Sequence, residues 1–279
     1  MSASASSASS ASSGRKIGEV ILDVKNISLR FGGVKALTDI SFDVREHEVR
    51  AIIGPNGAGK SSLLNCINGV YAPQEGAISL RGESFGHLNS RERIRKTAEM
   101  GVARTFQNLA LFKGMSVIDN IMSGRNLRMH TNLFQQALRN PWFGAAEREE
   151  TEHREFVEHI IDFLEIQAFR KTPVGQLPYG LQKRVDLGRA LAMEPQVLLL
   201  DEPMAGMNVE EKQDMSRFIL DVNDEYGMTI VLIEHDMGVV MDISDRVVVL
   251  DYGKKIGDGT PQVVRSNPEV ISAYLGASH

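Results

Sequence analysis

The chain has 279 residues, of which 42% are hydrophobic and 24% charged, values that are ordinary for one large or two small soluble globular domains. Its formal net charge of -5 gives no basis for binding nucleic acid or for holding an anionic lipid surface unaided. No apolar run approaches the roughly 18–20 residues that span a bilayer, so any membrane role requires a partner protein.

The first 16 residues are predicted to form a disordered tail, because Met1–Gly14 is almost wholly serine and alanine. This stretch lacks the cationic start and apolar centre of a secretory signal. The single cysteine, Cys66, has no disulfide partner within the chain and lies in a helical pattern. We interpret it as a small buried side chain in a reducing compartment.

Two alternating segments, Val20–Phe31 and Leu37–Val44, are predicted as half-buried strands separated by Gly32-Gly33. A short apolar strand, Val49–Ile53, leads into a glycine-rich loop and then into a helical pattern over Ser61–Gly69. A strand, a glycine-rich loop and a helix in this order open an α/β nucleotide-binding fold.

The glycine-rich loop is a phosphate-binding motif, since Gly54–Ser61 reads GPNGAGKS and matches the pattern G-x-x-x-x-G-K-[ST] in full. Its glycines let successive backbone N–H groups point at phosphate oxygens, and the N-terminus of the next helix adds partial positive charge. Lys60 is expected to reach the β- and γ-phosphates, and the Ser61 hydroxyl to ligate Mg²⁺. The expected phosphate-binding residues are Gly54, Pro55, Asn56, Gly57, Ala58, Gly59, Lys60, Ser61 and Ser62.

From about Asn108 to Gly180 the pattern is mostly helical, which predicts a helical subdomain inserted into the α/β core. Asn140-Pro141 marks a break before its longest helix. Hydrophobic residues recur every three to four positions on one face of that helix: Phe156, Val157, Ile160, Ile161, Phe163 and Leu164.

Two short apolar runs, Val197–Leu200 and Ile230–Ile233, end in acidic residues, as buried parallel strands do. The first run continues into Asp201, which can hold Mg²⁺ directly or through water, and Glu202, which can orient or deprotonate the attacking water. An apolar strand that ends in Asp-Glu is a weak indication of a catalytic site by itself. The phosphate loop upstream makes the catalytic interpretation the better one. Farther on, Asp245–Ile256 is predicted to form a closing hairpin before a short C-terminal helical segment.

The order of the motifs resembles that of ABC ATPases. After the phosphate loop come Gln107, then LPYGLQKR at Leu177–Arg184, then Asp201-Glu202, and then His235 within IEHD. The resemblance covers essentially the whole chain after its tail. It implies an α/β fold: a P-loop NTPase core of mixed sheet, with an antiparallel β subdomain and an inserted helical subdomain at about residues 108–180. Residues 17–279 would then form one ABC ATP-binding domain.

The resemblance also implies that two such domains pair head to tail. Each ATP then lies between one subunit's phosphate loop and the other subunit's signature segment, whose Tyr179 and Gly180 would contact the nucleotide. Phe31 is at the position of the aromatic residue that stacks on adenine. The alternative for Phe31 is an ordinary core residue at a strand end.

Three residues are expected to act in hydrolysis: Glu202, His235 and Gln107. Gln107 resembles the glutamine that contacts both Mg²⁺ and the attacking water, and His235 resembles the switch histidine that touches the γ-phosphate. The Mg²⁺ ligands would be Ser61, Gln107 and Asp201. A lone glutamine or histidine is usually a satisfied polar residue, so these roles depend on the shared order of motifs.

Departures from the common ABC pattern point to one subfamily. LPYG, MAGMN at Met204–Asn208, GVARTFQN at Gly101–Asn108 and AYLG at Ala273–Gly276 resemble the larger of the two paralogous ATPases of branched-chain amino acid importers. Pro178 offers the opposing nucleotide neither a hydroxyl nor a backbone N–H, and Leu181 stands where the subfamily tends to have glutamine. Contact across the pair is therefore expected to rely on backbone amides at the start of the following helix.

The subfamily implies the partners: two transmembrane permease subunits, a paralogous ATPase subunit in a heterodimer and, indirectly, a periplasmic solute-binding protein. The permeases would hold the chain at the cytoplasmic face of the inner membrane. Importers of this kind also take up urea, amides or aromatic acids, so the cargo stays open. Other classes fit less well, because a DNA-repair ABC ATPase needs long heptad arms and a P-loop kinase has no use for a signature segment.

Overall fold

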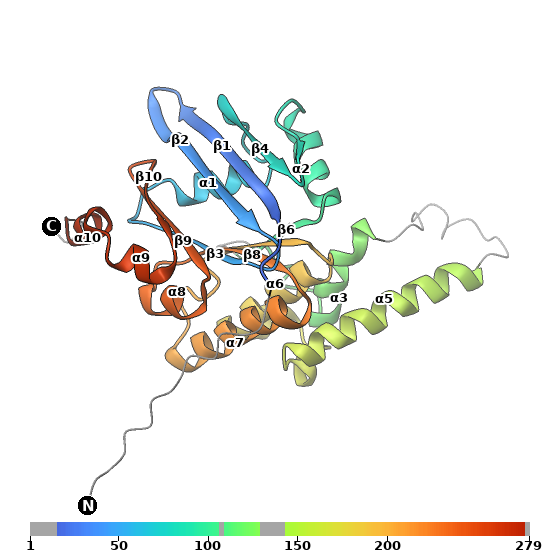
Figure 1. The fold of residues 1–279 in the computed structure, drawn as a ribbon. Helices are drawn as coiled ribbons and strands as arrows, with labels where there is room; N and C mark the ends of the chain where they lie inside the picture. Colours follow the sequence, from blue (N-terminus) through green and yellow to red (C-terminus); the bar gives the residue numbers. More distant parts are fainter. Residues whose placement is uncertain (1–15, 106–108, 129–142, 277–279) are drawn as a thin grey trace, which may run out of the picture.

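The computed structural model describes residues 16–105, 109–128 and 143–276, and most of the predicted tail, Gln107 and the Asn140-Pro141 break lie outside these ranges. The described chain contains two sheets (Figure 1). The first has the order β2-β1-β4-β5 and is antiparallel, with strands β1 (Val20–Phe31), β2 (Val34–Arg45), β4 (Glu75–Leu80) and β5 (Glu83–Ser84). The second has the order β10-β9-β3-β8-β7-β6, with strands β3 (Val49–Ile53), β6 (Val102–Arg104), β7 (Val197–Asp201), β8 (Thr229–Ile233), β9 (Arg246–Asp251) and β10 (Lys254–Gly259).

The sequence patterns located β1, β2, β3, β7, β8 and the β9–β10 hairpin closely, whereas β4, β5 and β6 were not predicted. The bounds of β1 and β3 are the predicted ones, and β2 is longer than predicted by three residues at its start and one at its end. In the second sheet all strands run parallel except β10, which pairs antiparallel with β9 as the predicted hairpin. Every residue of β3, β7 and β8 is buried, as their continuous apolar runs indicated. The predicted mixed α/β fold is therefore confirmed.

The helices join these strands and cover the second sheet. Between β6 and β7 the described residues form helices, turns and one isolated bridge. On α5 the predicted apolar face is buried at Val157, Ile160, Ile161 and Leu164. None of the helices in the described ranges combines the length and apolarity needed to cross a bilayer. The helices are α1 (Lys60–Ile67), α2 (Ser90–Glu99), α3 (Val117–Met122), α5 (Phe143–Phe163), α6 (Tyr179–Leu191), α7 (Val209–Glu225), α8 (Met237–Ile243), α9 (Pro261–Arg265) and α10 (Pro268–Gly276), with short 3₁₀ turns η1 (Ser123–Leu127), η2 (Gln167–Phe169) and η3 (Val174–Gln176).

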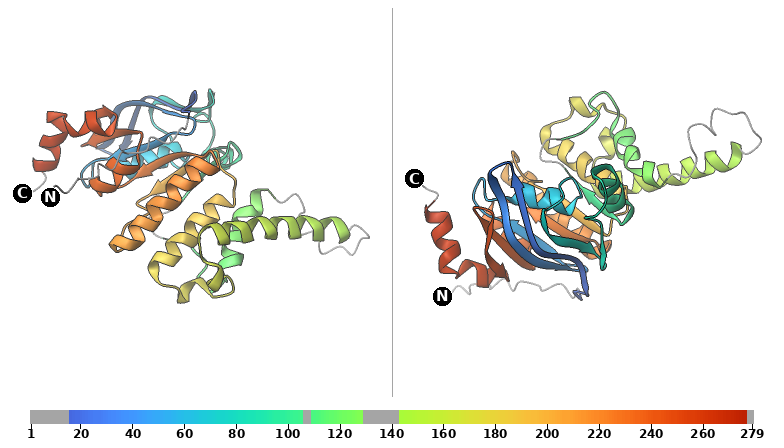
Figure 2. Two further views of the ribbon diagram at one scale, coloured as in Figure 1. Left: turned by 60° about the horizontal axis from the view of Figure 1, so that its bottom comes forward. Right: turned by 90° about the horizontal axis from the view of Figure 1, so that it is seen from above.

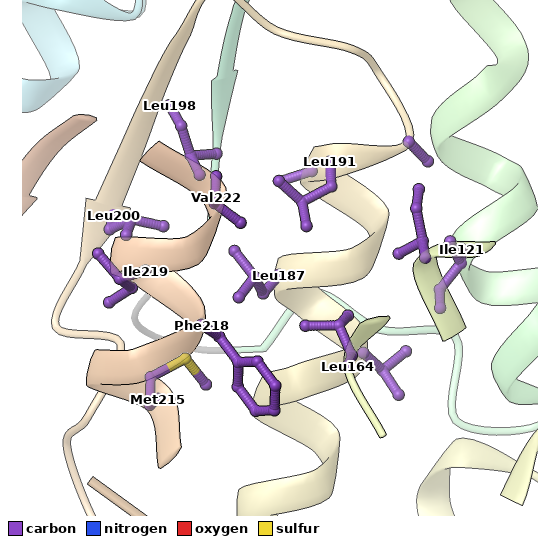
Figure 3. Packing of buried hydrophobic residues seen from close by; sticks show 14 of the residues in the cluster. Ile121, Leu164, Leu187, Leu191, Leu198, Leu200, Met215, Phe218, Ile219 and Val222 are labelled. Atoms are coloured by element: carbon purple, nitrogen blue, oxygen red, sulfur yellow. The ribbon is translucent and has the colours of Figure 1, made fainter. Parts of the chain in front are cut away.

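Buried hydrophobic clusters cover both faces of the six-stranded sheet. Figure 3 shows Leu198 and Leu200 of β7 facing side chains of α6 and α7, among them Leu187 and Phe218. On the other face, Leu199 packs in a second cluster with residues of α1 and of the antiparallel sheet. Helix α5 extends from the molecule at the end away from α10 in both views of Figure 2. The carboxyl ends of β3, β7 and β8 meet at one edge of this sheet, which is where α/β proteins bind ligands.

Candidate nucleotide-binding site

The loop after β3 needs glycine at two positions for space. A Cβ atom on Gly54 would collide with the carbonyl oxygen of Leu250 in β9. Gly59 has φ +101, and a Cβ atom there would lie 2.7 Å from the carbonyl oxygen of Ala36 in β2. Gly59 also caps α1, and no side chain caps the first amides of this helix. The loop is thus packed against two strands, while the start of α1 suits an anion.

Lys60 is the first residue of α1, and its side chain is folded into the loop. Its Nζ donates hydrogen bonds to the carbonyl oxygens of Gly54, at 2.7 Å, and Pro55, at 3.1 Å. Burial lowers the pKa of Lys60, and the carboxylates of Glu202 and Asp201 oppose that shift. The ammonium group is therefore coupled electrostatically to the two acidic residues at the end of β7.

Asp201 presents one free acceptor. Its Oδ2 accepts a hydrogen bond from Nη2 of Arg104 at 2.7 Å, in an ion pair that is almost fully buried. Its Oδ1 is also buried and has no hydrogen-bond partner among the described residues. An orphaned carboxylate oxygen is a ligand that Mg²⁺ prefers. The residues present at the end of β7 therefore fit a divalent cation.

Glu202 and His235 approach each other from neighbouring strands. Glu202 has φ +49 and donates its backbone N–H to the carbonyl oxygen of Ile233, at 2.9 Å. Its Oε1 lies 3.8 Å from Nδ1 of His235. Between them, the buried Glu234 accepts backbone hydrogen bonds from Met204, at 2.9 Å, and from His235, at 3.2 Å. Glu234 thereby ties the loop after β8 to the loop after β7, and burial raises the pKa of its carboxyl group.

An open cleft of ≈ 1120 Å³ brings the loop and the two strand ends together. Glu202 and His235 lie in it opposite the phosphate loop, and the β9–β10 hairpin and α10 form further walls. A cleft of this size accepts a nucleotide. Its lining comprises Gly54, Pro55, Asn56, Gly57, Ala58, Glu202, His235, Asp251, Tyr252, Ile256, Glu269, Ser272, Ala273 and Tyr274.

The remaining predicted residues are not among those that line the cleft in the described structure. Ser61 is exposed and Ser62 half-buried in the first turn of α1. Phe31 ends β1 with 45% of its surface exposed, and its ring meets that of Tyr71 edge to face, with 5.0 Å between the ring centroids. Gln107 lies outside the described residues. The exposed ring of Phe31 is compatible with stacking on a base.

The signature segment opens α6. Pro178 precedes the helix without a side-chain cap, and the half-exposed Tyr179 is its first residue. Leu181 is partly buried and packs against the hydrophobic core. Gln182 donates from Nε2 to the carbonyl oxygen of Leu177 at 2.8 Å, which closes the turn before the helix. One chain therefore provides a signature helix outside its own cleft.

Four residues at the site received no role from the sequence patterns, although each stands within a recognised motif: Arg104, Lys183, Glu234 and Tyr274. Arg104 also donates to Oδ1 of Asn65 at 2.6 Å, bridging α1 and Asp201. The Tyr274 hydroxyl is buried beside the backbone N–H of Gly54, and burial raises the pKa of Tyr274 to about 12. Their position within these motifs is the signal that could have found them.

Comparisons with known proteins agree with this geometry. The family model described as ABC transporter matches residues 37–205, and a model described as branched-chain amino acid ATP-binding cassette transporter matches residues 254–279. The chain is 40% identical to the high-affinity branched-chain amino acid transport ATP-binding protein BraF of Pseudomonas aeruginosa, over 92% of this chain and 98% of that relative. It is 38% identical to LivG of Escherichia coli, which carries the same description, with the same coverage.

Solved structures give the same result. The ADP conformation of an ATP-binding cassette of an ABC transporter has a TM-score of 0.77 at 30% sequence identity, covering 92% of this chain and 99% of that one. A nucleotide-free ATP-binding cassette from an ABC transporter has a TM-score of 0.76 at 29% identity, covering 91% and 98%.

Proposed function

This chain belongs to the ABC transporter family of ATPases, and from that premise we propose that it drives uptake of branched-chain amino acids or related small solutes. The observation that carries the ATPase role is the single cleft shared by the phosphate loop, Glu202 and His235. The named relatives and the match over residues 254–279 support the amino-acid cargo. An importer of urea, amides or aromatic acids is the second candidate, because the subfamily that the sequence resembles also includes importers of those solutes.

The identity of the transported solute can be tested on the solute-binding protein, which selects it. We expect the solute-binding protein encoded beside this chain to bind leucine, isoleucine or valine in titration calorimetry. Binding of urea, an amide or an aromatic acid instead would favour the second candidate. Neither result bears on the ATPase role, because the cleft is proposed to bind a nucleotide and not the solute.

In the proposed site, Lys60 and the loop amides bind the β- and γ-phosphates. Oδ1 of Asp201, the Ser61 hydroxyl and Gln107 would hold Mg²⁺, which when bound neutralises charge on the phosphate oxygens. Glu202 orients the attacking water and accepts its proton, while His235 contacts the γ-phosphate. His235 and Glu202 lie 3.8 Å apart, so both groups face the same part of the cleft.

Two such chains complete the site. Because Tyr179 and the first amides of α6 lie outside this chain's own cleft, we propose that they contact the nucleotide held by a paralogous ATPase subunit, and that the paralogue returns the same contact. Two permease subunits would bind this pair and hold it at the cytoplasmic face of the inner membrane.

Phe31→Ala is expected to weaken ATP binding about fivefold, because one stacking contact is worth on the order of 1 kcal/mol. Affinity for inorganic tripolyphosphate, which has no base, should stay unchanged. Titration calorimetry with both ligands measures this difference. Equal losses for ATP and tripolyphosphate, or a lower melting temperature with no loss for either, would mean that Phe31 is only a core residue.

The permeases are expected to contact the helical subdomain at α3, which follows Gln107 closely in the sequence. Phe112 and Met115, which precede α3, are 55% and 39% exposed, and exposed apolar side chains of this size favour a partner surface. Cys66 is fully buried and its pKa is raised to about 12, so introduced cysteines can be labelled selectively.

In the assembled transporter, Phe112→Cys should therefore crosslink to a permease, whereas Tyr252→Cys should not. Tyr252 is the matched control, because it is 87% exposed on the β9–β10 hairpin. Mass spectrometry of the crosslinked chains identifies the partner. Permease crosslinks from residue 252 and none from residue 112 would contradict this docking.

A further inference from the structure

The signature helix carries a buried lysine that reaches the backbone of Glu202. Lys183 lies on the first turns of α6 and is only 4% exposed. Its Nζ donates a hydrogen bond to the carbonyl oxygen of Glu202 at 3.2 Å. The ammonium group also interacts with the carboxylates of Asp186, Glu234 and Asp201. Burying a lysine costs free energy that these acidic partners offset, so its position is specified by the site around it.

The peptide that Lys183 holds has a conformation that is uncommon for a side-chain-bearing residue. Glu202 has φ +49, in the left-handed region, which is strained outside glycine and persists only where the surroundings fix it. Its N–H donates to the carbonyl oxygen of Ile233 in β8. Its carbonyl oxygen accepts hydrogen bonds from Lys183 of α6 and from the backbone N–H of Ala205, each at 3.2 Å. The backbone that aims the Glu202 carboxylate is thus fastened to the sheet on one side and to the signature helix on the other.

Further contacts join α6 to the segment after β7. The ring of Tyr179 packs on Gly206, where an added Cβ atom would lie 3.2 Å from it. The Glu211 side chain packs so closely on Gly180 that a Cβ atom there would collide with it. Both contacts involve the first two residues of the signature helix. A displacement of the start of α6 therefore acts on the chain that follows Glu202.

We propose that Lys183 is a positioning residue that fixes the Glu202 main chain and so couples the signature helix to the hydrolytic carboxylate of the same chain. The inference rests on the proposed function, in which the start of α6 contacts the nucleotide held by the partner ATPase. Engagement of α6 by that nucleotide then sets the position of Glu202 in this chain's own cleft. Each of the two sites thereby depends on closure of the other.

Lys183→Met tests this, because methionine fills a similar volume without a donor or charge. We expect phosphate release by the assembled pair at saturating ATP to fall about 10- to 100-fold, the order of loss that a misplaced catalytic group produces. The KM for ATP and the affinity of the ATP-dependent pair should both stay within about twofold of the wild-type values, well below the expected loss of turnover. Lys96→Met, a lysine on α2 paired only with the exposed Glu83 in the described structure, is the matched control and should behave as wild type.

A double-mutant cycle separates positioning from general damage. If Lys183 acts through Glu202, adding Lys183→Met to Glu202→Gln should not lower the residual turnover further, whereas a merely structural role lowers it in both backgrounds. Should Lys183→Met fail to fold, Lys183→Leu decides, because leucine is likewise apolar and removes both the donor and the charge. Reduced turnover at an unchanged KM then supports the proposal, and wild-type turnover overturns it.

The failure of this inference differs from a failure of the proposed function. Turnover of Lys183→Met close to wild type, together with an inactive Glu202→Gln, overturns the positioning role and leaves the ATPase assignment intact. An active Glu202→Gln protein removes the premise itself.

Discussion

Replacing Lys60 with alanine is expected to abolish ATP hydrolysis and to weaken ATP binding. The Nζ atom lies inside the phosphate loop, bonded to two loop carbonyl groups and coupled to Glu202 and Asp201. With phosphates in the loop, it supplies the positive charge that matches them. Loss of such a preorganised charge costs at least about 10²-fold in turnover. Phosphate release by the assembled pair and calorimetric titration with ATP measure the two effects.

Lys96→Ala is the control, since it removes a lysine from α2, away from the cleft, and should change neither quantity. A melting temperature for Lys60→Ala close to that of wild type would show that the fold is kept. Wild-type turnover of a folded Lys60→Ala protein would remove the whole site assignment.

Local sequence patterns predicted the strands and the phosphate loop well because each is encoded by neighbouring residues. Alternation gave the observed bounds of β1, and the continuous apolar runs indicated that β3, β7 and β8 are buried parallel strands. The helix after the loop was predicted at Ser61–Gly69, whereas α1 spans Lys60–Ile67. Gly69 is excluded because it has φ +73 and ends the turn that follows the helix.

The contacts that organise the site were beyond such patterns, because they join residues far apart in the chain. Arg104 reaches Asp201 across 97 positions, and Lys183 reaches Glu202 from another element. Likewise, sequence alone left the contact made by Leu181 open, and the structure shows that this partly buried side chain packs against the core. The wall that α10 adds beside Gly54 depends on how the C-terminal helices fold back, which periodicity does not encode.

Glu202→Gln is expected to lose nearly all turnover while binding ATP at least as tightly as wild type. Glutamine keeps the shape and hydrogen-bonding reach of the side chain but removes the basicity that accepts a proton from water. General-base catalysis contributes typically about 10²- to 10⁴-fold. The substitution also removes a negative charge near the γ-phosphate, which favours the ATP-bound closed pair.

His235→Ala should also slow hydrolysis, but it should trap the closed pair less. The imidazole lies 3.8 Å from Glu202 at the cleft. In the proposed site it also contacts the γ-phosphate, so its removal deletes that contact as well. Comparing the two variants separates loss of the hydrolysis step from loss of the ATP-dependent pair. A stable ATP-dependent pair is expected for Glu202→Gln, and a weaker one for His235→Ala.

Size-exclusion chromatography of Glu202→Gln with its paralogue, in ATP and Mg²⁺, alongside phosphate release, tests the central claim most directly. We expect an ATP-dependent pair that elutes as one species and releases almost no phosphate, while the subunits without ATP elute separately. A Glu202→Gln protein that hydrolyses ATP within about threefold of wild type, a difference of only about 0.65 kcal/mol in the barrier, would contradict it.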